Sequence, residues 1–189
     1  MSGKLIIVCA PSGAGKTTIV RHILENIPGV EFSVSATNRK QRPTEVNGVD
    51  YYFIDTDDFT ERIGRQEFLE WEEVYPGTFY GTLKSEIERI WNRGNHVIFD
   101  VDVEGGLNIK RHYGERAMLV FVQPPSLEVL KERLRLRATE TQKDYEVRVK
   151  KAGREMEYAR HADKILINDT LDKALKEALD LVKSFLFES

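Results

Sequence analysis

The feature that most constrains the fold of this chain is the run APSGAGKT at residues 10–17. It follows an apolar, β-branched stretch at residues 4–10 that predicts a buried strand, and it precedes a helical pattern over about residues 15–26. The run matches the spacing G-x-x-x-x-G-K-[ST] at every specified position except the first, where Ala10 stands in place of glycine. In such a strand–turn–helix loop, successive backbone amides converge on phosphate oxygens at the helix N-terminus. The sequence therefore predicts a nucleotide-phosphate site at the end of its first strand.

The side chains that close this loop carry specific chemistry. Lys16 can reach the β- and γ-phosphates of a nucleotide, and the hydroxyl of Thr17 can coordinate Mg2+. Asp100 lies at the end of another apolar run, where a second carboxylate can hold the metal from the opposite side, although a turn or capping aspartate would occupy the same place. A dinucleotide site is disfavoured because position 18 is Thr and not a third glycine. The predicted nucleotide contacts in the loop are Ala10, Pro11, Ser12, Gly13, Ala14, Gly15, Lys16, Thr17 and Thr18.

Hydrophobic patterning predicts an α/β fold in which helices cover both faces of a central parallel sheet, because parallel neighbours need crossover connections. Strands are expected over residues 4–10, 30–35, 51–54, 96–101, 118–122 and 164–168. Helices are expected over residues 15–26, 57–74 with an interruption near Gly64, 82–94 with Thr82 as N-cap, 126–137 capped by Ser126, 144–161 and 170–186. The acidic stretch between the second and fourth of these strands breaks the alternation, which indicates an insertion into the core.

Composition excludes several classes of protein. The 189 residues suffice for one domain of ordinary size, and the formal net charge of −3 gives no general attraction to nucleic acid or anionic lipid. The longest unbroken apolar runs have six residues, whereas a membrane-spanning helix needs about 20. The single cysteine, Cys9, allows no intramolecular disulfide and lies in an apolar run typical of an inert core residue. We expect a cytoplasmic protein with neither a nucleic acid nor a membrane as partner.

The loop alone leaves GTPases, ATPases and small-molecule kinases open, so the second substrate must be sought elsewhere in the chain. The Asn-Lys-x-Asp guanine motif of GTPases does not occur. Residues 32–51, FSVSATNRKQRPTEVNGVDY, resemble the nucleoside-monophosphate segment of guanylate kinases. The resemblance covers nearly the whole chain and continues through Glu70-Trp71, Tyr80-Gly81-Thr82, Asp100-Val101-Asp102, residues 133–141 and Ile167-Asn168-Asp169.

This resemblance implies roles for particular residues. Arg39, Arg42, Tyr51 and Tyr80 would hold the GMP phosphate, Glu45 would belong to the same substrate site, and Ser35, Glu70, Thr82 and Asp102 would read the guanine. Arg133, Arg137 and Arg148 would be catalytic lid arginines beside Lys16, and Asn168 would lie near the adenine of ATP. The residue types suit these roles, because a guanidinium offers a planar fork to phosphate and a carboxylate matches the donors on the guanine edge.

The resemblance further implies the P-loop nucleoside-monophosphate kinase fold and the reaction ATP + GMP = ADP + GDP, with ATP as co-substrate and Mg2+ as metal. The expected organisation is a single domain with a core at residues 1–35, 95–133 and 155–189, a GMP-binding segment at 36–94 and a lid at 134–154, acting as a monomer or homodimer. Two other classes stay open: a non-catalytic guanylate-kinase-like module that binds peptides, and a kinase of the same architecture with another acceptor.

Overall fold

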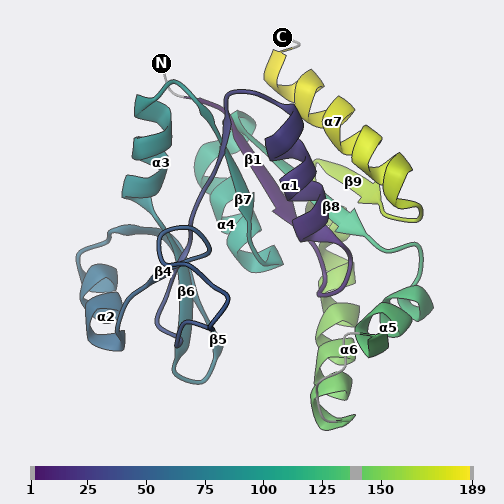
Figure 1. The fold of residues 1–189 in the computed structure, drawn as a ribbon, viewed down its shortest axis with the longest axis horizontal. Coiled ribbons are helices and arrows are strands. Elements are labelled where there is room, and N and C mark those ends of the chain that lie inside the picture. Colours follow the sequence, from purple (N-terminus) through teal and green to yellow (C-terminus); the bar gives the residue numbers. More distant parts are fainter. Residues whose placement is uncertain (1–2, 137–141, 188–189) are drawn as a thin grey trace.

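A five-stranded parallel sheet forms the centre of the protein, whose computed structural model describes residues 3–136 and 142–187 (Figure 1). Its strand order is β2-β7-β1-β8-β9, and every neighbouring pair is parallel. The strands are β1 (Leu5–Cys9), β2 (Val30–Phe32), β7 (His96–Asp100), β8 (Ala117–Gln123) and β9 (Lys164–Ile167). The predicted α/β fold with a central parallel sheet is thereby confirmed.

Helices cover both faces of this sheet because successive side chains of a buried strand point to opposite faces. On one face, Ile6 and Val8 of β1 belong to the core cluster formed with α1 (Lys16–Asn26) and α7 (Leu171–Phe187). On the other, Leu5, Ile7 and Cys9 pack in a cluster with α3 (Lys84–Asn92) and α4 (Val103–Tyr113). Helix α4 is absent from the sequence-based expectations, although it provides much of the second face. Cys9 is 1% exposed, and burial raises the pKa of its thiol to about 12, as expected of an inert core residue.

A second sheet of four strands, ordered β4-β3-β6-β5, lies beside the core (Figure 1). Its strands are β3 (Ala36–Thr37), β4 (Tyr52–Phe53), β5 (Phe68–Tyr75) and β6 (Thr78–Leu83), and α2 (Thr56–Gly64) packs on it. The sheet has a small core of its own, in which the rings of Phe59 and Phe68 stack with centroids 4.4 Å apart. The insertion inferred from the acidic stretch therefore folds as a separate sheet.

Two sequence-based expectations about this sheet are wrong. The segment expected to continue as helix to residue 74 leaves the helix after Gly64 and forms β5, which pairs antiparallel with β6 through a turn at Pro76-Gly77. Thr82 lies within β6 and caps no helix, because α3 begins at Lys84. Pairing with β6 and stacking of Phe68 on Phe59 outweigh the acidic, helix-compatible composition of the segment. The second predicted strand is also shorter, since β2 ends at Phe32.

Helices α5 (Leu127–Leu136) and α6 (Gln142–Glu157) project beyond the sheet and pack on each other through Leu130, Leu134 and Ala152 (Figure 1). Ser126 caps α5 as predicted, because its Oγ accepts a hydrogen bond from the amide of Val129 at 3.2 Å. Short 3-10 turns occur at Gly114–Arg116 and Tyr158–His161. Within the described ranges, the helices are all too short or too polar to cross a membrane.

Candidate active site

The glycine-rich loop lies at the carboxyl end of β1 and leads into α1 with left-handed glycines. Gly13 has φ +89° and Gly15 has φ +94°, a backbone conformation that other residues rarely adopt. Space also requires glycine at position 15, since a Cβ there would lie 2.4 Å from Nδ2 of Asn168. Ala10 is not among the residues with positive φ, so its methyl group is compatible with the turn. The loop thus has the backbone geometry that its sequence predicts.

Lys16 and Thr17, at the start of α1, both face the carboxylate at the end of β7. Lys16 Nζ lies 2.7 Å from Oδ1 of Asp100 and donates to the carbonyl oxygen of Val101 at 2.6 Å. Thr17 Oγ1 donates to Oδ2 of Asp100 at 3.3 Å. Strands β1 and β7 are parallel neighbours, so the loop after one and the carboxylate at the end of the other meet at the same sheet edge. The three side chains predicted to serve Mg2+ and the phosphates are therefore brought together.

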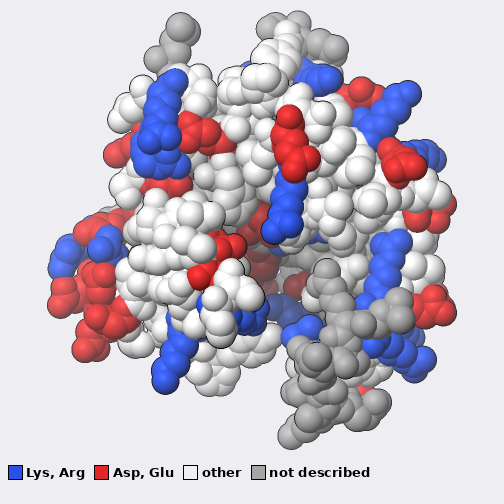
Figure 2. Space-filling view, in the orientation of Figure 1, with Lys and Arg blue, Asp and Glu red and all other residues white. Residues whose placement is uncertain are grey.

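A cleft of about 430 Å3 opens between this loop and the second sheet. Figure 2 shows a hollow near the middle of this face, with acidic side chains in its depth. Its lining includes the whole loop from Ala10 to Thr18 and, of the other predicted site residues, Ser35, Arg42, Tyr51, Glu70, Tyr80, Asp100 and Asp102. Seven residues without a predicted site role complete it: Glu72, Val74, Tyr75, Gly81, Val101, Lys151 and Glu155. One cleft thus joins the phosphate loop to most residues expected at the second nucleotide.

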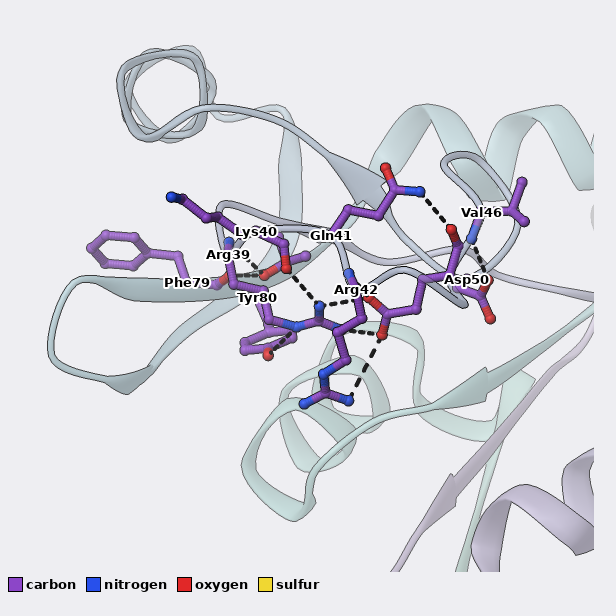
Figure 3. Close-up of polar contacts among 10 residues, drawn as sticks. Arg39, Lys40, Gln41, Arg42, Val46, Asp50, Phe79 and Tyr80 are labelled. Atoms are coloured by element: carbon purple, nitrogen blue, oxygen red, sulfur yellow. Dashed lines mark hydrogen bonds and ion pairs between the residues drawn. The ribbon is translucent and has the colours of Figure 1, made fainter. Parts of the chain in front are cut away.

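Arg39 lies in a cluster of polar contacts beside the second sheet (Figure 3). Its Nη1 and Nη2 donate to the two carboxylate oxygens of Glu45 at 2.7 and 2.6 Å, and its Nε donates to the Tyr80 hydroxyl at 3.0 Å. Its guanidinium also lies over the Tyr51 ring, 4.9 Å from the centroid. The hydrogen bonds from Arg39, with a further one from the Arg42 amide, lower the pKa of Glu45 to about 2. Glu45 is therefore an ionised partner that orients Arg39, and neither residue lines the cleft itself.

Glu70 and Thr82 face each other across β5 and β6, where Thr82 Oγ1 donates to Oε1 of Glu70 at 2.6 Å. Burial raises the pKa of Glu70 to about 7, aided by the nearby charge of Asp102 and opposed by the Thr82 hydrogen bond. Asp102 is the N-cap of α4, since its Oδ1 accepts from the Gly105 amide at 2.8 Å. A Cβ on Gly105 would lie 2.8 Å from Oε2 of Glu70, so the glycine allows α4 to pack closely against the Glu70 side chain.

Glu72 is a cleft residue that the sequence reasoning missed. It stands two positions after Glu70 on β5, directly opposite Tyr80 of β6, and shares the cleft-facing side of the strand. A hydrogen bond with Asp102, together with burial, raises its pKa to about 8. The period-two spacing of Glu70, Glu72 and Val74 is the signal that could have identified it, once the segment is recognised as a strand.

Four further predicted residues that the structure describes do not line the cleft: Thr82, Arg133, Arg148 and Asn168. Arg133 of α5 donates through Nη2 to the carbonyl oxygen of Asn168 at 3.1 Å. The side-chain Nδ2 of Asn168 in turn donates to the carbonyl oxygen of Ala14 in the phosphate loop at 2.7 Å, and the residue is 5% exposed. Arg148 lies on α6, and Arg137 lies outside the described residues.

Helix α6 also contributes two cleft residues that had no predicted role. Lys151 lines the cleft beside Glu155, with Nζ and Oε1 3.8 Å apart. Burial raises the pKa of Glu155, while the charge of Lys151 and a hydrogen bond from the Ser12 amide oppose the shift. Helix α6 therefore touches the phosphate loop directly.

Comparisons with known proteins agree with this geometry. The profile of the family described as guanylate kinase matches residues 2–185. The guanylate kinase of Bacteroides thetaiotaomicron is 48% identical over 186 residues, which cover 98% of this chain and 91% of that protein. That of Salinibacter ruber is 46% identical over 182 residues, 96% of each chain. A crystal structure of guanylate kinase from Anaplasma phagocytophilum shows the same fold, with a TM-score of 0.79 at 24% identity over all of this chain and 88% of that one. By its sequence and by its fold, the chain belongs to the guanylate kinase family.

Proposed function

We propose that this enzyme transfers the γ-phosphoryl group of ATP to GMP, giving ADP and GDP. The observation that carries this assignment is the single cleft that has the phosphate loop on one wall and Ser35, Tyr51, Glu70 and Tyr80 on the other. Two nucleotides bound on these walls would meet with their phosphates between them. Family membership at 48% identity over nearly the full length supports the same reaction.

On the ATP side, the loop amides and Lys16 bind the phosphates. Lys16 is now paired with Asp100 at 2.7 Å, and its ammonium is within reach of phosphates that enter the loop. Asn168 supports the site through the loop backbone, because its amide holds the carbonyl of Ala14 while its own carbonyl accepts from Arg133. We therefore assign Asn168 to the ATP site as a residue that holds the phosphate loop in place. Its proximity to adenine stays a prediction.

The donor set near Lys16 fits Mg2+. The Thr17 hydroxyl and the Asp100 carboxylate, 3.3 Å apart, are the oxygen ligands that this cation prefers, and it commonly takes only one or two of them from protein beside nucleotide phosphates. When bound, Mg2+ would neutralise charge on the β- and γ-phosphates.

On the GMP side, the wall offers a guanidinium, hydroxyls and carboxyls. Arg42, Tyr51 and Tyr80 line the cleft where the phosphate would lie, and Glu45 keeps Arg39 preoriented beside them. Glu70 and Asp102 would accept hydrogen bonds from the N1 and N2 donors of guanine, with Thr82 and Ser35 as hydroxyl partners. No general base is needed, because the acceptor phosphate is already ionised at neutral pH, so positioning and electrostatics supply the rate.

Closure completes the site. Arg133 does not line the cleft in this conformation, and Arg148 does not either. Movement of a lid at residues 134–154 toward the second sheet would bring Arg137 and Arg148 onto the transferring group, beside Arg133, which borders the lid on the core side. The division into a core, a GMP-binding segment at 36–94 and this lid is part of the proposal, as are a cytoplasmic location and a monomeric or homodimeric state.

A coupled assay of ADP release with ATP and each of GMP, AMP, CMP and UMP tests the assignment. Rapid release with GMP alone is expected. Release with another monophosphate would indicate a kinase with a different acceptor, and no release with any of them would indicate a non-catalytic module. The Lys16→Ala variant, prepared in the same way, serves as the blank for contaminating kinases.

A further inference from the structure

Glu86 of α3 is a buried carboxylate to which the proposed reaction gives no role. It is 3% exposed, and it comes from the helix that follows β6. A buried carboxylate is costly unless its oxygens receive hydrogen bonds, so its partners show what it holds together.

The partners of Glu86 come from three separate parts of the chain. Oε1 accepts from the backbone amide of Val34 at 3.2 Å, and Oε2 accepts from the Tyr52 hydroxyl at 3.1 Å. Arg89, one turn along α3, donates to both oxygens at 2.9 Å and uses its remaining Nη1 to reach Glu31 of β2 at 3.1 Å. Burial alone would raise the pKa of Glu86, but the hydrogen bonds from Arg89 and Val34 lower it. The carboxylate is thus ionised, and both of its oxygens accept hydrogen bonds.

Two of these partners are the immediate neighbours of residues on the GMP side of the cleft. Val34 precedes Ser35, and Tyr52 follows Tyr51; both Ser35 and Tyr51 line the cleft. The amide of Tyr52 also donates to the carbonyl oxygen of Ser35 at 2.9 Å, which joins the two segments directly. Glu86 therefore fixes the spacing between two chain segments, at Val34 and Tyr52, that are 18 positions apart in sequence and meet in the folded protein.

The constraint extends to the phosphate-binding cluster. The Tyr51 ring lies 5.7 Å from that of Tyr80 in an edge-to-face contact, and it supports the Arg39 guanidinium. A shift of β4 would move Tyr51 and, with it, the surface on which Arg39 rests. Through Arg89 and Glu31 the same carboxylate is tied to the edge strand of the central sheet. Glu86 thus connects the second sheet, through Tyr52, to the central sheet, through Arg89 and Glu31.

We infer that Glu86 is a positioning residue for GMP: it sets Ser35 and Tyr51 at the spacing that the monophosphate requires, without touching the nucleotide. The inference rests on the proposed function, because it assumes that GMP occupies this wall. Loss of Glu86 should therefore weaken the binding of GMP and not that of ATP, because the Glu86 contacts reach the GMP wall and the phosphate loop lies across the cleft.

The test compares the effect of substitutions at Glu86 on the KM for GMP with their effect on the KM for ATP. Glu86→Ala should raise the KM for GMP by about tenfold or more while the KM for ATP stays within about twofold, because small displacements of binding groups cost this much. Glu86→Gln, which can still accept from Val34 but loses its charge toward Arg89, should fall between wild type and Ala. Glu88→Gln, an exposed neutralisation on the same helix, is the matched control and should resemble wild type.

A milder variant covers the case in which Glu86→Ala does not fold. Tyr52→Phe removes one hydroxyl and its hydrogen bond to Glu86, and it should raise the KM for GMP by about two- to fivefold. Calorimetric titration with GMP in the absence of ATP should show the same loss in affinity.

The outcomes separate the inference from the function on which it rests. If Glu86→Ala and Tyr52→Phe lower only the melting temperature and leave the KM for GMP within about twofold, Glu86 is a purely structural residue. An equal rise in both Michaelis constants would also overturn the inference. If wild type itself fails to phosphorylate GMP, the proposed function fails instead.

Discussion

The raised pKa of Glu70 predicts that recognition of GMP depends on pH. Burial raises this pKa to about 7, so the carboxyl is about one tenth ionised at pH 6 and about nine tenths ionised at pH 8. In the proposed complex, guanine presents N–H donors to Glu70, and these need the ionised, accepting form. GMP therefore binds only the deprotonated fraction well, and its KM should fall about tenfold as the pH rises from 6 to 8.

The phosphate of GMP also titrates, at a pKa of about 6, so a control must remove that contribution. Glu70→Gln keeps the volume of the side chain but has no titratable proton, and it binds the same phosphate. We would measure the KM for GMP at pH 6, 7 and 8 for both proteins at saturating ATP. The ratio of variant to wild-type KM should grow about tenfold over this range. Parallel pH profiles would refute the reasoning, because they would show that Glu70 is ionised throughout or does not meet the base.

The same carboxylate should set base choice. Adenine would leave Glu70 without its donors in a buried site, and a mismatch of this kind costs a factor of about 10^4 or more. Glu70→Ala should therefore lower kcat/KM for GMP strongly and hardly affect AMP. An unchanged GMP/AMP ratio would move the guanine reader to Asp102 and Thr82.

Local sequence was sufficient to predict the features that depend on neighbours in the chain. The phosphate loop is one such feature, because its glycines, Lys16 and Thr17 act through a backbone turn that eight consecutive residues specify. Asp100 was predicted from its place at the end of a buried strand, and the parallel sheet then brings it to within 2.7 Å of Lys16. The α/β class followed in the same way from alternating strands and helices.

The features that were missed depend on pairing between distant segments. Residues 68–75 carry enough acidic residues to resemble a helix, and only the partner strand β6 and the ring of Phe59 make them a strand. With that segment read as helix, Glu72 could not be placed on the cleft wall beside Glu70. Glu86 is similar, since its partners at Val34 and Tyr52 are 52 and 34 residues away and nothing in the local sequence marks them.

Three further predictions address the ATP side, closure and the carboxyl wall. Lys16→Ala should lower kcat by roughly a hundred- to a thousandfold and leave GMP affinity, measured by calorimetry, within a few-fold; retention of more than about a tenth of the activity would contradict its role. A bisubstrate analogue should reduce the radius of gyration in small-angle scattering, and an unchanged profile would remove the argument for a closing lid that carries Arg137 and Arg148.

The last prediction concerns Glu72, whose Oε2 is buried and finds no donor among the described residues, while its neighbour Asp102 is itself an acceptor. A proton on Glu72 satisfies both carboxyls, and for this reason the hydrogen bond with Asp102 raises the pKa of Glu72 from 4.5 to about 8. Between these two values the folded state holds a proton that the unfolded chain releases, so this group's contribution to stability is complete below about pH 4.5 and is lost as the pH rises through 8. Glu72→Gln holds its amide hydrogens at every pH, so the nucleotide-free variant should be more stable than wild type at pH 8.5, by about 1 to 2 kcal/mol after allowance for solvent screening, and nearly equal to it at pH 5. Thermal denaturation at the two pH values, with Glu88→Gln as the control, measures this difference, and a Glu72→Gln effect of the same size at both would show that the two carboxyls do not share a proton.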